Sequence, residues 1–134
     1  MITLTNPSAQ TVQPGQIVTF TTVDTHTGCS ECYRPGTNSV KLRTGGSYEI
    51  TYAANVSNAV ANQAIQLGVA LSGTVIPISI AIEAPAVAGT LTNMTRTVPV
   101  VNCCCDFDRI TLVNSGPNPI NLGPNPMLYI RRVG

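Results

Sequence analysis

The sequence predicts an all-β protein, a jelly-roll β-sandwich of about eight to ten antiparallel strands. Three observations lead to this fold class. Apolar and polar side chains alternate with a period of two along most of the chain, and the alternating runs are rich in β-branched residues. The runs are separated by Gly and Pro, and the 134 residues suit one domain of ordinary size. We expect residues 1–14 to form an N-terminal arm and residues 15–134 to form the single jelly-roll domain.

The strands are expected wherever this alternation continues for several residues. In residues 47–56, for example, Tyr48, Ile50 and Tyr52 share one face while Glu49 and Thr51 share the other. Short Gly-containing segments at residues 44–46 and 72–73 provide turns between neighbouring strands. The expected strands are residues 17–22, 38–43, 47–56, 64–71, 75–82, 86–101, 107–113 and 127–133.

A proline-rich segment, residues 114–126, separates the last two expected strands. Its four prolines argue against both a helix and a central strand, and the sequence Gly-Pro-Asn-Pro occurs in it twice. Loops of this length are often contact surfaces or functional loops. We therefore take Pro117, Asn118, Pro124 and Asn125 as candidate contacts to a particle or a ligand.

The composition excludes several classes of function. Charged residues make up 10% of the chain, well below the typical quarter, which suits a protein that hides much of its surface in an assembly. The seven basic residues are scattered, so no surface for nucleic acid is expected. Residues 67–87 are apolar but alternate and contain Gly, Pro and Glu83, so we expect no membrane span. The first residues lack the features of a signal peptide, which predicts synthesis in the cytoplasm.

Three segments resemble the superfamily of tumour necrosis factor and the globular domain of complement q. They are GGSYEITYAANVS at residues 45–57, AIQLGVALSGTVIPIS at residues 64–79 and NPMLYIRRVG at residues 125–134. The resemblance implies a ten-strand jelly roll that assembles as a tight homotrimer. It also implies that Tyr48, Tyr52 and Tyr129 lie near the three-fold axis or in the core.

Bacterial and phage proteins on this scaffold include the C-terminal domains of collagen-like spore-surface glycoproteins and small fibre or capsid-decoration proteins. The present chain has no collagen-like stalk, very few aromatic residues and no signal peptide. These differences favour a short virion protein over a secreted signalling protein.

Five cysteines fall into two clusters, Cys29-x-x-Cys32 and Cys103-Cys104-Cys105. Cys103 and Cys105 lie on one face of an extended segment, so they can complete a four-sulfur zinc site with Cys29 and Cys32. Two alternatives stay open. The cysteines form disulfides, with the odd one left free or paired between subunits, or they are reduced and buried without a role.

No catalytic constellation is visible, and we expect no enzymatic activity. His26 is the single histidine, and a lone histidine in a loop is usually solvated. Asp106 and Asp108 have the spacing of an acid–base pair, but Arg109 beside them makes an ordinary surface charge cluster the better interpretation.

The favoured function is therefore a structural virion protein, a homotrimeric decoration or fibre-type protein on a phage particle, with the major capsid protein as its partner. The alternatives are a carbohydrate- or receptor-binding module and a protein of a bacterial spore or cell surface. For a sugar site, Tyr33 is the one plausible exposed ring.

Overall fold

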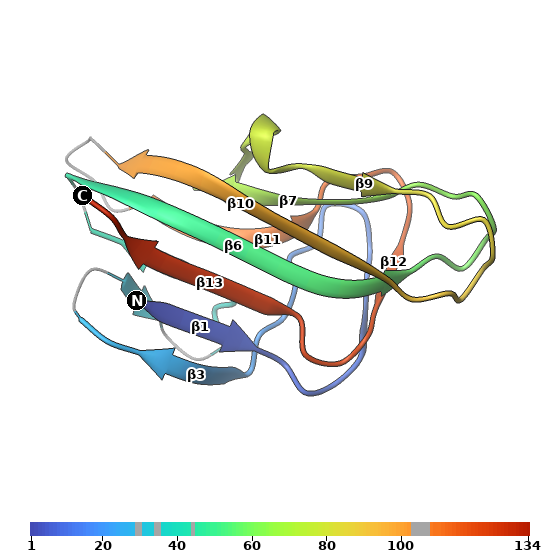
Figure 1. The fold of residues 1–134 in the computed structure, drawn as a ribbon, viewed down its shortest axis with the longest axis horizontal. Coiled ribbons are helices and arrows are strands. Elements are labelled where there is room, and N and C mark those ends of the chain that lie inside the picture. Colours follow the sequence, from blue (N-terminus) through green and yellow to red (C-terminus); the bar gives the residue numbers. More distant parts are fainter. Residues whose placement is uncertain (29–30, 34–35, 44, 103–107) are drawn as a thin grey trace.

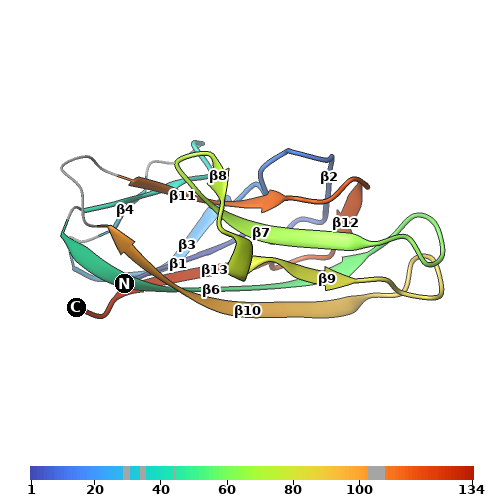
Figure 2. The same ribbon diagram turned by 90° about the horizontal axis from the view of Figure 1, so that it is seen from above.

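The fold is a jelly roll of two antiparallel sheets packed face to face, as a computed structural model shows (Figures 1 and 2). The structure describes residues 1–28, 31–33, 36–43, 45–102 and 108–134. The first sheet has seven strands in the order β2-β12-β6-β13-β1-β3, and β10 pairs with β6. The second has six strands in the order β4-β5-β11-β7-β8, and β9 pairs with β7. The predicted fold class is confirmed.

The chain passes several times between the two sheets, as a jelly roll requires. β1, β6, β10 and β13 belong to the first sheet, and β5, β7, β9 and β11 to the second. The bounds of the strands are β1 Ile2–Thr5, β2 Gln10–Val12, β3 Thr22–His26, β4 Glu31–Tyr33, β5 Val40–Leu42, β6 Gly46–Ser57, β7 Ile65–Leu71, β8 Thr74–Val75, β9 Ala81–Glu83, β10 Thr92–Asn102, β11 Asp108–Asn114, β12 Ile120–Leu122 and β13 Met127–Arg132, and a 3-10 turn, η1, spans Pro77–Ser79.

The core lies between the sheets and follows the predicted alternation most clearly in β6. Tyr48, Ile50, Tyr52, Ala54 and Val56 of this strand are buried in the core, and the residues that alternate with them face outward. Because the side-chain period of a strand is two, a slip of one residue in β6 would bring its polar residues into the core. The pattern therefore fixes the register of the central strand.

Residues 17–22 do not form one strand, although the predicted alternation does place Val18 and Phe20 in the core. The amide of Val18 donates to Leu112 of the second sheet at 2.7 Å, whereas the amide of Thr21 donates to Thr5 of the first sheet at 3.1 Å. The segment crosses from one sheet to the other, so it cannot pair continuously with either.

The expected strand over residues 75–82 is also interrupted, and η1 separates β8 from β9. Pro77 lacks a backbone N–H, so the ladder cannot continue through it. The buried hydroxyl of Ser79 compensates, because it accepts from the amide of Val69 at 2.8 Å and donates to the carbonyl of Ile76 at 2.6 Å.

Two further segments, residues 1–14 and residues 114–126, contain strands that the sequence does not predict. Residues 1–14 contribute β1 and β2 to the first sheet, and Ile2 and Leu4 are fully buried, so this segment is part of the sandwich and not an arm. Residues 114–126 include the short strand β12, which pairs with β2 and β6. The prolines fall on either side of β12, where no ladder hydrogen bond is lost.

Candidate functional site

An uncharged row of side chains crosses the outer face of the first sheet. The cross-strand register places Thr25, Thr3, Tyr129, Thr51 and Thr97 side by side on β3, β1, β13, β6 and β10. The hydroxyl of Thr25 donates to that of Thr3 at 2.7 Å, and the hydroxyls of Thr51 and Thr97 lie 2.9 Å apart. Tyr129 is half-buried at the centre of this row. We call the outward side chains of these five strands the threonine face.

The threonine face carries little charge beyond this row. A second row places Thr5, Met127 and Ala53 beside one another. In the described part of β1, β6, β10 and β13, the charged residues at outward positions are Glu49 and Arg131, which form an ion pair of 3.4 Å. In β3, Asp24 is exposed beside the irregularity in the pairing with β1. A nearly uncharged face of this kind can be covered by another protein without desolvating isolated charges.

One end of the sandwich exposes apolar side chains. The loop of residues 58–64 joins β6 to β7, and the loop of residues 84–91 joins β9 to β10; they lie side by side at the right of Figure 1. Neither loop contains a charged residue. Val60, Val87 and Leu91 are 57%, 66% and 59% exposed. We call these two loops the apolar tip, and exposed apolar patches of this kind mark contact sites.

Hydrogen bonds hold the apolar tip in shape. The amide of Asn62 donates to the carbonyl of Pro85 at 2.9 Å, and the amide of Gly89 donates to the carbonyl of Asn58 at 3.0 Å. The buried side chain of Asn58 also donates to Pro85, at 3.1 Å. The exposed valines and leucine are therefore presented on two loops that are bonded to each other.

The predicted contact residues of the proline-rich segment border the apolar tip. Pro117 is exposed, and the side chain of Asn118 donates to the carbonyl of Ala64 at 3.1 Å. The two segments therefore form one continuous surface, a proximity that their separation in the sequence does not reveal.

The second pair of predicted contact residues lies in the turn before β13. Pro124 and Asn125 are both exposed, and Asn125 has a φ of 62°. The amide of Asn125 donates to the carbonyl of Asn6 at 2.8 Å, which ties the turn to the segment after β1. Both residues are accessible to a partner.

Of the three tyrosines expected near a trimer axis or in the core, two lie in the core of the protomer. Tyr48 and Tyr52 are fully buried in the core. The hydroxyl of Tyr48 donates to Arg43 at 3.0 Å, and that of Tyr52 donates to Ser79 at 2.5 Å. Burial raises the pKa of both phenols, that of Tyr52 to about 12. Only Tyr129 of the three lies on the outer surface.

Tyr33 does not provide the exposed ring that the sequence suggests. Its ring is partly buried against the core, and its hydroxyl donates to the carbonyl of Phe20 at 3.0 Å. A sugar platform needs a ring face open to solvent. Tyr33 is better described as part of the core boundary.

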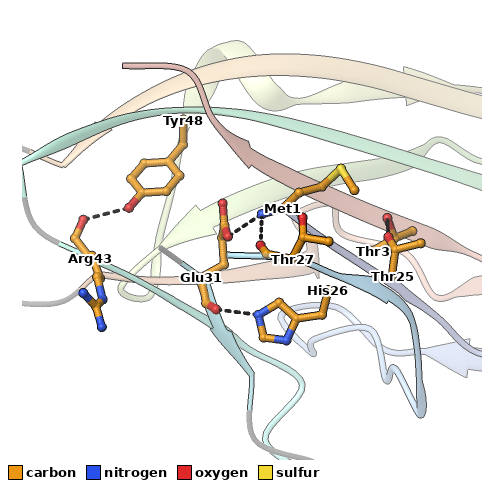
Figure 3. A network of polar contacts seen from close by, with 8 residues as sticks. All are labelled: Met1, Thr3, Thr25, His26, Thr27, Glu31, Arg43 and Tyr48. Atoms are coloured by element: carbon orange, nitrogen blue, oxygen red, sulfur yellow. Dashed lines mark hydrogen bonds and ion pairs between the residues drawn. The ribbon is translucent and has the colours of Figure 1, made fainter. Parts of the chain in front are cut away.

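The opposite end of the sandwich holds a buried carboxylate (Figure 3). The α-ammonium group of Met1 donates to Glu31 Oε2 and to the carbonyl of Thr27, both at 2.7 Å. The Glu31 side chain is completely buried, and its Oε1 has no hydrogen-bond partner in the described residues. His26 Nε2 lies 2.9 Å from the Glu31 carbonyl oxygen. The ammonium group is thus the main compensation for a buried charge.

The cysteine prediction falls largely outside the described residues. Cys29, Cys103 and Cys105 lie outside them, as does Asp106, and the side chain of Cys32 is likewise not described. Among the residues that the structure does describe, no three His, Cys, Asp or Glu side chains gather as metal ligands. Zinc on the four cysteines therefore stays a prediction. No helix in the described ranges is long and apolar enough to cross a membrane.

Comparison with known proteins adds a similarity in structure alone. No protein-family model and no curated protein matches the chain. The sugar-binding C-terminal domain of EclA is 13% identical, with a TM-score of 0.41 over 93% of this chain and 78% of that one. The vertex protein P5 of PRD1 is 16% identical, with a TM-score of 0.46 over 95% and 93%. The CBM35 domain of Abf62 from Cellvibrio japonicus is 16% identical, with a TM-score of 0.41 over 98% and 96%. Because these TM-scores are below 0.5, a function for this chain has to be inferred from its own surfaces.

Proposed function

We propose that this chain is a non-enzymatic structural protein of a virion, a homotrimeric decoration or fibre-type protein on a phage particle. The observation that carries the proposal is the apolar tip, because it gathers three aliphatic side chains that are more than half exposed, and gathered apolar side chains mark contact sites. The resemblance to the tumour-necrosis-factor superfamily at residues 45–57 and 64–79 supports the same reading.

The threonine face is the proposed contact between the three subunits. Tyr129 lies at its centre, and aromatic side chains are enriched in the buried middle of protein interfaces. The Thr3, Thr25, Thr51 and Thr97 hydroxyls already have partners within the row or can rotate to new ones, so covering them leaves few unsatisfied groups. Tyr48 and Tyr52 support this face from the core side of the sheet.

The apolar tip, with Pro117 and Asn118 at its border, is the proposed contact to the particle. The two loops comprise residues 58–64 and 84–91, fewer residues than the roughly 20–30 per side of a stable interface. A single tip is therefore a weak contact. A trimer that presents three tips to a repeating protein lattice, such as that of a major capsid protein, gains the affinity by multivalency.

Native mass spectrometry of the untagged protein tests the trimer. We expect a trimer for the unmodified chain and monomers for Tyr129→Lys, since this substitution places three like charges in the proposed contact. Thr74→Lys, at an exposed position of β8 in the other sheet, is the matched control and should leave the trimer intact. A monomeric unmodified protein would remove the trimer from the proposal, and a trimeric Tyr129→Lys would remove the threonine face from it.

Adding the protein back to particles assembled without it tests the attachment. The double variant Val60→Asp/Val87→Asp should remain trimeric and fail to bind, because it places charges on the apolar tip. Binding equal to that of the unmodified protein would show that attachment uses another surface.

A further inference from the structure

An open hollow of about 480 Å³ lies over the outer side of the second sheet. It is formed where β11, the β7–β8 turn and the segments before β5 and near residue 17 meet. Four of its seven lining residues bear a hydroxyl group, and one basic and one large aliphatic residue lie beside them. These lining residues are Ile17, Thr37, Ser39, Ser72, Arg109 and Thr111.

The β7–β8 turn is fixed against β11 at the edge of this hollow. The amide of Ser72 donates to the carbonyl of Arg109 at 2.8 Å, and the amide of Arg109 donates to the hydroxyl of Ser72 at 3.3 Å. Ser72 and Gly73 have φ values of 50° and 89°, the pair of positive values that a two-residue hairpin turn requires. The position of a Cβ at Gly73 has no atom within 4 Å, so the rim of the hollow is open on this side.

Among the described lining residues, Arg109 carries the positive charge, and Lys41 of β5 lies opposite it in the strand register. The Arg109 side chain is exposed and forms no ion pair with any described residue, unlike Arg131, which is bonded to Glu49 on the other sheet. A guanidinium group binds a carboxylate through two parallel hydrogen bonds. A guanidinium that has no ion-pair partner among the described residues therefore favours a ligand with a carboxylate group.

The rest of the lining suits the body of a sugar. The hydroxyl groups of Ser39 and Thr111 can each donate one hydrogen bond and accept two, which matches the hydroxyl groups of a sugar ring. Ile17, which is 39% exposed, offers an apolar surface to the C–H groups of the same ring. The volume lies within the usual range for small-molecule sites.

We propose that this hollow binds a carboxylate-bearing sugar, a uronic acid or a similar acidic residue of a glycan, with Arg109 on the carboxylate. Phosphate is the less suitable anion, because Arg109 is the single cationic group among the described lining residues and phosphate sites usually combine several donors or charges. The site goes beyond the proposed structural role, since it would let the protein attach to an acidic surface glycan while it is mounted on a particle.

The experiment is a titration of the full chain with D-glucuronic acid, followed by two-dimensional NMR of the backbone amides. We expect saturable shifts that centre on Arg109, Thr111 and Ser72, and affinity for D-glucose at least tenfold weaker. Arg109→Gln should lower the affinity for glucuronic acid to that for glucose, because the charged pair is lost. Arg96→Gln, which removes an exposed arginine from β10 of the other sheet, is the matched control and should leave the affinity unchanged.

Three outcomes would overturn the site. They are the absence of saturation at high millimolar glucuronic acid, an undiminished affinity of Arg109→Gln, and binding of inorganic phosphate as tightly as glucuronic acid, which would mean a general anion site. Amide spectra of Arg109→Gln that retain their dispersion establish that the variant is folded. The titration measures sugar binding, whereas native mass spectrometry measures the trimer. The sugar site and the structural role can therefore be refuted separately.

Discussion

Replacing Tyr52 by Phe removes a single hydroxyl group from the centre of the sandwich. This hydroxyl donates to the carbonyl of Ser79 at 2.5 Å and lies 3.3 Å from the carbonyl of Leu67. Both partners belong to elements of the second sheet side, whereas Tyr52 belongs to β6 of the first. The hydroxyl is therefore a polar link between the sheets at the place where η1 interrupts the β8–β9 segment.

The loss should cost about 1–2 kcal/mol of unfolding free energy. A neutral hydrogen bond contributes about 1 kcal/mol net, and the carbonyl of Ser79 is left in a buried place without this donor. For a chain of this length, that corresponds to a fall in Tm of roughly 3–10 °C. Tyr52→Phe keeps the volume of the ring, so no cavity contributes to the change.

The measurement is thermal and urea unfolding of Tyr52→Phe beside the unmodified protein, with the native mass of both. Since Tyr52 is fully buried in its own protomer, the oligomeric state should not change. Phe20→Leu, a change of volume in the same core, is the control for a purely packing-dependent loss. An unchanged Tm would refute the polar link, and a changed oligomeric state would place Tyr52 at a subunit contact instead.

Four further outcomes are expected. Burial raises the pKa of Tyr52 to about 12, so the native state keeps a proton that the unfolded chain releases near pH 10. The free energy of unfolding in urea should therefore fall as the pH rises from about 10 to 12. Tyr52→Phe should remove most of this pH dependence. Acetylation of the Met1 amine leaves the Glu31 carboxylate buried without its cation, so the free energy of unfolding in urea should fall by about 3–5 kcal/mol. The stability of Glu31→Gln should change far less on acetylation. Asn114→Ala removes bonds to the Val12 and Asn118 carbonyls at 3.0 and 2.8 Å from a fully buried side chain, and calorimetry should show a loss of about 2–4 kcal/mol. For the cysteines, we expect native mass spectrometry to show one zinc per subunit that a chelator removes with a fall in Tm; a metal-free mass lighter by the hydrogens lost in disulfides would contradict this.

The sequence predicts the fold well where a strand stays in one sheet. In β6 and β7 the predicted and observed bounds differ by one residue at most at each end, and burial alternates along most of β6. In β7, Gly68 and Ala70 are buried as well as most of the predicted apolar positions. It predicts less well where the partner changes. Residues 17–22 alternate correctly, yet they pass from Leu112 to Thr5, and nothing in a local pattern indicates which strand accepts each hydrogen bond.

Side-chain hydrogen bonds explain the other differences. Ser79 replaces a ladder bond to Val69. Asn114 donates to Asn118, just before β12, and to Val12 of its partner strand β2, so a segment with four prolines still contains a strand. A propensity argument counts the lost N–H groups of the prolines but not the side chains that take their place. The burial of Tyr33 has a similar cause, because its hydroxyl donates to the carbonyl of Phe20 and this bond holds the ring against the core.

The candidate surfaces depend on register, and register is a property of pairs of strands. Thr3, Thr25, Thr51, Thr97 and Tyr129 are scattered over more than a hundred residues, and each by itself is an ordinary outward position of a strand. Only the pairings of β1 with β3 and β13, and of β6 with β10 and β13, bring them into one row. The apolar tip is different, because residues 58–64 and 84–91 already lack charge in the sequence. Such runs between strands are usually read as turns, and it is their mutual hydrogen bonding and their high exposure that make them a surface for a partner.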